Sequence, residues 1–107
     1  MKLQPNPFEA IKAGVKTIEI RLNDEKRQQI QAGDTIEFIK LPETQKTMSV
    51  QVKDLYSFAT FRELFEAYPV EDLGGESVEM LLEQLYTYYS PEDEKKWGVL
   101  GIRVQLI

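Results

Sequence analysis

One stretch constrains this chain more than any other, the segment Gly-Val-Lys-Thr-Ile-Glu-Ile-Arg at residues 14–21. Its second part alternates apolar and polar residues, which is typical of a strand with one buried face. The apolar positions are Ile18 and Ile20, and the polar positions on the opposite face are Thr17, Glu19 and Arg21. Same-face neighbours on a strand lie roughly 6.5–7 Å apart. Long side chains there can therefore contact one another, and Lys16 can swing toward them from the preceding turn.

Two interpretations are open for the polar row, the side chains of Thr17, Glu19 and Arg21 on one strand face. In the first, it is a solvated strand face, and its ion pair contributes at most about 1 kcal/mol. In the second, it is the floor of a cleft, where Glu19 orients Lys16 and Arg21. Such cations can bind a phosphate, and such a carboxylate can accept hydrogen bonds from a base edge. The residues alone leave both interpretations standing.

The spacing G-x-K-x-x-E-x-R resembles the signature of the ASCH domain family, small domains related to PUA RNA-binding domains. The matching positions are Gly14, Lys16, Glu19 and Arg21. The flanks are similar too, with a Pro-Phe helix start before the motif, a Gly33-Asp34 turn after it, and a final strand after Gly98. The resemblance implies one ASCH-like domain over residues 1–107. It also implies a cleft, centred on the motif, that binds RNA or a nucleotide-like ligand.

The periodicities of the rest of the chain favour an α+β domain over a doubly wound one. The expected strands are Met1–Leu3, 16–22, Thr35–Leu41, 48–53 and 100–106. The expected helices follow the caps Asn6, Asn23, Thr60 and Ser90, with a further helix from Val78. The second of them is a short polar helix from Asp24 to Ala32. The resemblance adds that the sheet forms a PUA-like small β-barrel with helices packed around it.

Composition excludes several kinds of chemistry. A chain of 107 residues is expected to form one domain. It contains no cysteine and no histidine, which excludes disulfides, thiolate metal sites and Ser-His-Asp arrangements. We therefore expect neither a metal nor a cofactor. No apolar run approaches the roughly 18 residues of a membrane helix, and no signal-peptide core is present, so we expect a cytoplasmic protein. The sequence carries no signal of an oligomeric state.

Charge is distributed unevenly along the chain. The net charge of −5 disfavours unselective binding to nucleic acid. Residues 1–53 nevertheless carry 9 Lys and Arg against 7 Asp and Glu, whereas residues 54–107 carry 4 against 11. A basic ligand site in the first half remains compatible with this distribution, and the acidic second half could instead dock a protein partner.

Further ligand-binding candidates lie outside the motif. They are accessible aromatic or hydroxyl side chains at Tyr56, Ser57 and Tyr88, each of which can equally belong to packing or to a turn. Lys26 and Arg27 either flank the cleft and contact phosphates or belong to a solvated short helix. Gly74-Gly75 is predicted to be a flexible turn, because no Gly-Lys-Ser/Thr pattern of a phosphate loop follows it.

The resemblance also suggests an enzymatic alternative. Some small ASCH relatives are amidohydrolases that act on acetylated cytidine through a Lys, a Thr and a more distant Glu. Lys16 matches that lysine and Glu76 corresponds to the distant glutamate, but Glu19 stands at the threonine position. If the chain hydrolyses a modified nucleoside, Lys16, Glu19 and Glu76 are its candidate catalytic residues. Without the hydroxyl, we favour a binding domain over an enzyme.

Overall fold

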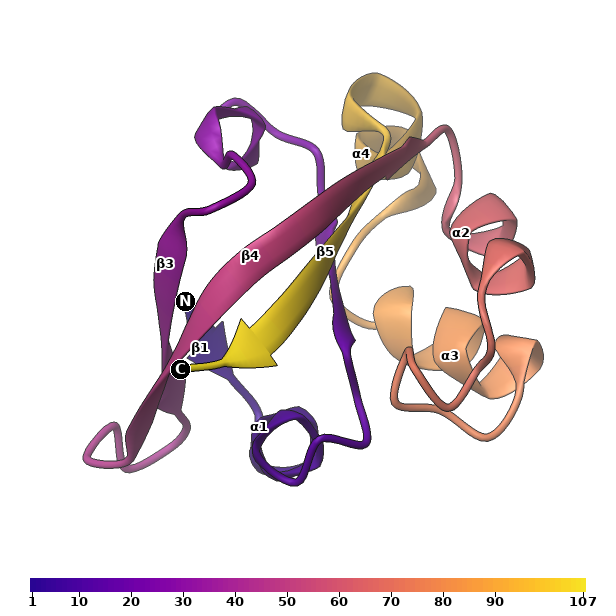
Figure 1. Cartoon of the computed structure of the whole chain (residues 1–107). Helices are drawn as coiled ribbons and strands as arrows, with labels where there is room; N and C mark the ends of the chain where they lie inside the picture. The colour runs from indigo at the N-terminus through magenta and orange to yellow at the C-terminus, as the bar shows by residue number, and fades with distance from the viewer.

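The computed structural model describes residues 1–107, and four α-helices and a 3-10 turn surround a single curled sheet (Figure 1). The strands are β1 (Lys2–Leu3), β2 (Ile18–Leu22), β3 (Thr35–Lys40), β4 (Thr47–Phe58) and β5 (Val99–Leu106). The helical segments are α1 (Pro5–Lys12), η1 (Arg27–Gln29), α2 (Phe61–Ala67), α3 (Val78–Leu85) and α4 (Pro91–Trp97). The predicted α+β class, with helices outside a small curled sheet, is confirmed.

The order of the strands in the sheet is β1-β3-β4-β5-β2. β1 pairs with β3 in parallel, and the other neighbours are antiparallel. The sheet curls into a half-barrel whose two edges, β1 and β2, are not paired with each other. A side chain bridges these edges instead, because Nη2 of Arg21 donates to the carbonyl oxygen of Lys2 at 2.9 Å.

Two apolar cores occupy the two faces of the sheet. The core on the α1 side contains Leu3, Phe8, Ile11, Phe38, Val50, Val52, Leu100, Ile102 and Val104. The core on the α2 and α3 side contains Ile18, Ile20, Leu22, Phe61, Leu64, Phe65, Leu73, Leu81, Leu82 and Val99. Residues directly opposite each other in a sheet share a face. Glu19 is opposite Ile102 and therefore lies on the α1 side, whereas Ile18 and Ile20 pack toward the helices, as predicted.

Capping side chains begin the helices where the sequence predicts them. Oγ1 of Thr60 accepts a hydrogen bond from the backbone N of Glu63, and Oγ of Ser90 accepts one from Asp93 N, each at 3.1 Å. These bonds satisfy N–H groups that have no partner within the helix. α1 is an exception, because it begins at Pro5 after Gln4 and not after Asn6. None of the helices is long and apolar enough to cross a membrane.

The prediction of a helix from Asp24 to Ala32 is wrong. Only the 3-10 turn η1, at Arg27–Gln29, forms there. Oδ1 of Asp24 accepts a hydrogen bond from Arg27 N at 3.0 Å, which starts the turn. Ile30 is the one residue of this segment that packs against a core, so no apolar stripe holds a longer helix in place.

Candidate functional site

A cleft of about 1000 Å³ opens at the gap between the two edges of the half-barrel. One wall comes from β1 and the start of α1, the floor from Lys16 and β2, and the other wall from α3 and the residues on both sides of it. Its polar and aromatic lining consists of Lys2, Gln4, Asn6, Lys16, Glu19, Arg21, Glu76, Glu83, Gln84, Thr87, Tyr88 and Tyr89. The gap left by the unpaired edges therefore gives the molecule a concave surface.

Three charged side chains of the motif meet on the floor of this cleft. Nζ of Lys16 donates to Oε1 of Glu19 at 2.9 Å. Nε and Nη2 of Arg21 both lie 2.8 Å from Oε2 of the same carboxylate. Lys16 is 7% exposed and Glu19 is 4% exposed, and the side chain of Arg21 is 14% exposed. Of the two interpretations of the polar row, the structure therefore excludes a solvated strand face.

Opposing effects act on the carboxylate of Glu19. Burial by itself raises the pKa of Glu19, because a buried charge loses its hydration. The positive charges of Lys16 and Arg21, together with their hydrogen bonds, outweigh burial and hold the pKa of Glu19 below its ordinary value. One ionised carboxylate thus serves two cations, and the cluster keeps one net positive charge.

The backbone before β2 explains how Lys16 reaches this cluster. Gly14, at φ +79°, ends α1, and Val15 N donates to Ala10 O at 3.0 Å in the pattern of a glycine-terminated helix. The N–H groups of Thr17 and Ile18 then both donate to Asp72 O, at 2.9 and 3.0 Å. The chain turns at this shared acceptor, so the two-residue alternation does not extend back to Thr17. Strict alternation would place Thr17 beside Glu19. In the structure Lys16 lies beside Glu19 instead.

Gly74 is a positioning residue that the sequence analysis missed. It has φ +79°, and a Cβ added there would lie 2.7 Å from Cδ of Lys16. The loop between α2 and α3 therefore covers the aliphatic part of Lys16 only because residue 74 has no side chain. The Gly74-Gly75 pair was the available signal in the sequence. It predicted a flexible turn, but it did not indicate that this turn packs against Lys16.

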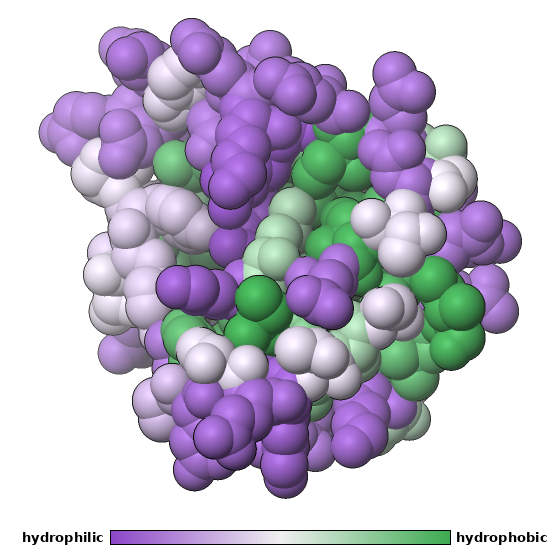
Figure 2. Space-filling view, turned by 90° about the vertical axis from the view of Figure 1, so that its left-hand side faces the viewer, coloured by the Kyte–Doolittle hydropathy of each residue, from purple (hydrophilic) through white to green (hydrophobic).

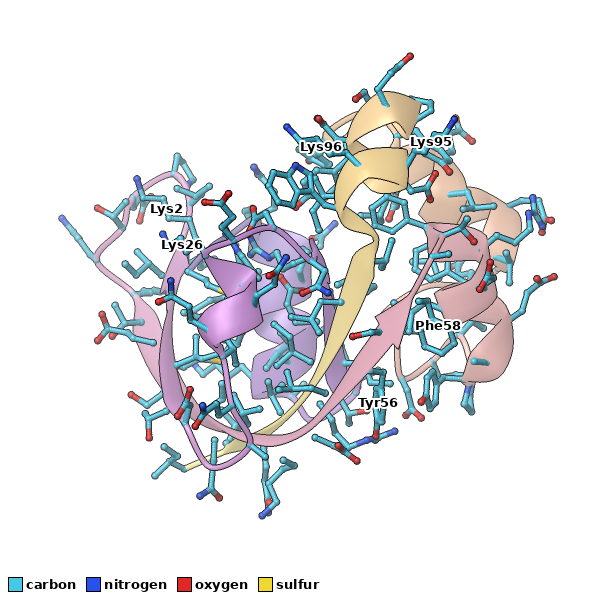
Figure 3. The ribbon with its side chains drawn as sticks, turned by 90° about the horizontal axis from the view of Figure 1, so that it is seen from above. Lys2, Lys26, Tyr56, Phe58, Lys95 and Lys96 are labelled. Atoms are coloured by element: carbon cyan, nitrogen blue, oxygen red, sulfur yellow. The ribbon has the colours of Figure 1, made fainter.

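The remaining predicted ligand residues divide between two places. Tyr88, 65% exposed, and Glu76 line the wall of the cleft opposite β1. Thr17 lies outside the cleft, with Oγ1 at 3.5 Å from Nη1 of Arg103. Tyr56 is also outside it, because its hydroxyl accepts a hydrogen bond from Nε of Arg103 at 2.7 Å on the α2 side of the sheet (Figure 3). Ser57 is exposed near the end of β4 and does not line the cleft.

The sequence matches the family model of the ASCH domain over residues 1–107. The chain belongs to the ASCH domain family. The resemblance drawn from the G-x-K-x-x-E-x-R segment is thereby confirmed, and the whole chain falls within the match. A search of curated proteins found no match.

Solved structures resemble this ASCH domain over its full length. The crystal structure of hypothetical protein PH0355 has a TM-score of 0.86 and 38% identity, with 100% of this chain and 96% of that chain covered. The solution NMR structure of protein PF0455 from Pyrococcus furiosus has a TM-score of 0.73 and 35% identity, with 100% and 94% covered. A mutant of ZmASCH from Zymomonas mobilis has a TM-score of 0.71 and 15% identity, with 98% and 65% covered, and shows the same fold. The predicted ASCH-type, PUA-like fold is confirmed.

Hydroxyl groups line only one wall of the cleft in this ASCH domain. They belong to Thr87, Tyr88 and Tyr89, which follow α3. The hydroxyl of Thr87 donates to Gln84 O at 2.6 Å, so it already has an acceptor. Lys16, on the floor, is bonded to Glu19 and to no hydroxyl. The cleft therefore presents cations, carboxylates and an exposed aromatic ring to a ligand.

Proposed function

We propose that this ASCH domain binds RNA, or a nucleotide-like part of it, in the cleft centred on Lys16, Glu19 and Arg21. The observation that carries this proposal is the buried cluster on the cleft floor, where one carboxylate holds two cations in fixed positions. Preorganised cations can meet a phosphate or a base carbonyl without an ordering cost. The relation of the family to RNA-binding PUA domains points to the same class of ligand.

The opposite wall supports the proposal with a different interaction. Tyr88 is 65% exposed at the cleft, and the half-buried side chain of Met80 lines the same wall. An exposed aromatic ring can stack on any base, with about 1–3 kcal/mol per base in proteins that bind single strands. The cleft thus combines a stacking surface with a charged floor, which suits an unpaired nucleotide and not a duplex.

Arg21→Ala is expected to weaken the binding of a short single-stranded RNA by about tenfold, because a hydrogen bond to a charged group contributes about 1.5–3 kcal/mol. Since the domain is acidic, few phosphates should be engaged, and log affinity should fall with log salt at a slope of about −1 to −3. Fluorescence anisotropy from about 50 to 200 mM salt measures both quantities. Arg62→Ala is the matched control, because Arg62 is exposed on α2. Equal affinities of Arg21→Ala and wild type would move the site elsewhere.

The runner-up function is hydrolysis of a modified, acetylated cytidine. In its favour, the lysine and the distant glutamate that the family resemblance names, Lys16 and Glu76, line the same cleft. Against it, the hydroxyl of Thr17, the residue before β2, lies 3.5 Å from Nη1 of Arg103, outside the cleft. The amine of Lys16 also already donates to Oε1 of Glu19 at 2.9 Å, so its partner on the cleft floor is a carboxylate and not a hydroxyl.

Wild-type protein is therefore expected to release no cytidine from acetylated cytidine above background. Incubation followed by chromatographic separation of the two nucleosides measures this. Glu19→Thr would supply the missing hydroxyl, but it would also leave two buried cations without a counter-ion, so the wild type is the decisive sample. Efficient release that Lys16→Ala abolishes would make hydrolysis the primary function.

A further inference from the structure

The backbone of β2 has an open edge that faces the cleft. β2 pairs with β5 alone, and its other side faces the gap between the two edges of the half-barrel. In an antiparallel pair, every second residue exchanges N–H···O bonds with the partner strand, and the residues between direct these groups the other way. The N–H of Asn23 donates to Gly98 O, and Thr17 O accepts from the N–H of Val104. Odd-numbered residues of β2 therefore bond to β5, and even-numbered residues direct their backbone groups to the gap.

Ile20 is the residue of this open edge that lines the cleft. Its side chain packs into the core on the α2 and α3 side, whereas its N–H and C=O face the gap, where no further strand pairs with β2. Neither group bonds to another part of the protein. Ile20 is 6% exposed, and buried backbone groups without a partner are rare. This residue therefore holds one donor and one acceptor, side by side, that are available to a ligand.

The other even-numbered residues of β2 do not offer the same groups to the cleft. Ile18 donates its N–H to Asp72 O at 3.0 Å. Leu22 also faces away from β5, but it does not line the cleft. The open edge within the cleft is therefore one residue long, which is too short for a peptide strand to pair with it.

A side chain already occupies the β1 side of the gap. β1 bonds to β3 through the carbonyl oxygens of Met1 and Leu3, so the carbonyl oxygen of Lys2 faces the gap. Nη2 of Arg21 donates to this oxygen at 2.9 Å. The guanidinium thus crosses the gap at this point, and a continuous peptide strand cannot pass between the two edges. A flat group that needs only one residue of edge can bind beside Arg21, at Ile20.

The face of the molecule that contains β3 provides a comparison. It is hydrophilic at its top and apolar across its middle (Figure 2). β3 is paired on both sides, with β1 and with β4. This strand therefore offers a ligand its side chains alone, whereas the cleft offers the backbone groups of β2 as well.

We propose that the cleft binds an unpaired nucleobase by its Watson–Crick edge, through hydrogen bonds to the N–H and C=O of Ile20. This inference rests on the proposed function, and it adds which edge of the base the protein contacts. Each of the common RNA bases carries a donor and an acceptor next to each other on that edge, and unpaired bases are often recognised there. In a duplex the same edge is already used, so a paired base would be rejected.

Nucleosides altered at this edge test the proposal. The common ribonucleosides are titrated into the wild type by NMR, and the one that binds most tightly is compared with an analogue methylated on its Watson–Crick edge. The methyl groups replace the ring N–H of uridine or guanosine, or both amino hydrogens of adenosine or cytidine. The analogue should bind at least about tenfold more weakly, because it loses a hydrogen bond and clashes with the strand. As a matched control, a methyl group at C5 of a pyrimidine, or carbon in place of N7 of a purine, should leave the affinity unchanged.

Amide hydrogen exchange of the wild type locates the bond at Ile20. At a saturating nucleoside concentration the N–H of Ile20 should exchange several-fold more slowly than in the free protein, because the base accepts its hydrogen bond. The N–H of Leu22 is the internal control, since it lies on the same open edge but outside the cleft, and its exchange rate should not change.

Three results would overturn base recognition at Ile20 while the proposed binding function stands. They are equal affinities for the nucleoside and its methylated analogue, equal slowing of exchange at Ile20 and Leu22, and binding of short RNA without binding of any nucleoside. Absence of binding by nucleosides and short RNA alike would instead overturn the proposed function itself.

Discussion

Replacing Glu19 with glutamine is expected to lower the free energy of unfolding by about 3–5 kcal/mol, the typical result of removing one partner of a buried ion pair. Glu19 is 4% exposed and is the carboxylate that Lys16 and Arg21 share. The amide keeps the size of the side chain but removes its charge, so two largely buried cations would lack a counter-ion. Urea-induced unfolding of the wild type and the variant measures the difference.

Glu9→Gln is the matched control for this substitution. Oε2 of Glu9 also lies 2.9 Å from a lysine Nζ, that of Lys40, but the side chain of Glu9 is 51% exposed. Water and salt screen an exposed pair, so Glu9→Gln should change stability far less than Glu19→Gln. Equal losses from the two substitutions would contradict the importance of burial at the cleft floor.

The stability difference between wild type and Glu19→Gln should depend on pH with a definite sign. The pKa of Glu19 is below 4.5, its ordinary value, in the folded protein, because Lys16 and Arg21 outweigh the opposing effect of burial. A group with a lowered folded-state pKa stabilises the fold above its unfolded-state pKa. The difference should therefore be complete above pH 4.5 and should shrink as the pH falls below that value toward the folded-state pKa. A difference that grows on acidification would contradict the ion cluster.

Gly74→Ala is expected to destabilise the protein and to weaken ligand binding as well. At φ +79° any alanine is strained, which costs about 1–2 kcal/mol. The new Cβ would also lie 2.7 Å from Cδ of Lys16, whose amine is held by Glu19, and such overpacking costs about 1–3 kcal/mol more. Relief of the contact requires Lys16 to move away from the floor of the cleft. Thermal unfolding and the RNA titration measure the two effects.

Gly14→Ala separates backbone strain from the contact with Lys16. Gly14 has the same φ of +79°, but no atom lies within 4 Å of the place that its Cβ would take. The Gly14→Ala variant should therefore lose stability through backbone strain alone, and its affinity for RNA should equal that of the wild type. If both substitutions lowered the affinity equally, Gly74 would have no part in positioning Lys16.

The fold followed from the sequence at most elements whose pattern is local, with the start of α1 as an exception. Alternation in β5 and the caps Thr60 and Ser90 predicted their elements correctly, since each depends on neighbours a few residues apart. The segment from Asp24 to Ala32 was mispredicted for the opposite reason. Its polar residues are compatible with a helix, but a short helix needs a packed face, and Ile30 alone does not provide one.

The floor of the cleft was predictable only in part. Period-two spacing brought Glu19 and Arg21 to one face, as observed. Thr17 departs from that spacing because its N–H shares the acceptor Asp72 O with the N–H of Ile18, and Asp72 is remote in sequence. The hydrogen bond between Tyr56 and Arg103, and the contact between Gly74 and Lys16, likewise join distant parts of the chain. Pairings of this kind leave no local signal.

The position of β5 also determines when the cleft can form. β2, which carries Glu19 and Arg21, pairs with β5 alone, and β5 follows every other element along the chain. Contacts between segments so distant in sequence slow folding, because a large loop must close before they form. During synthesis the motif is made early, yet β2 lacks its strand partner until residues 99–106 have emerged. The cleft is therefore completed last, and the binding proposed for it should be absent from an incomplete nascent chain.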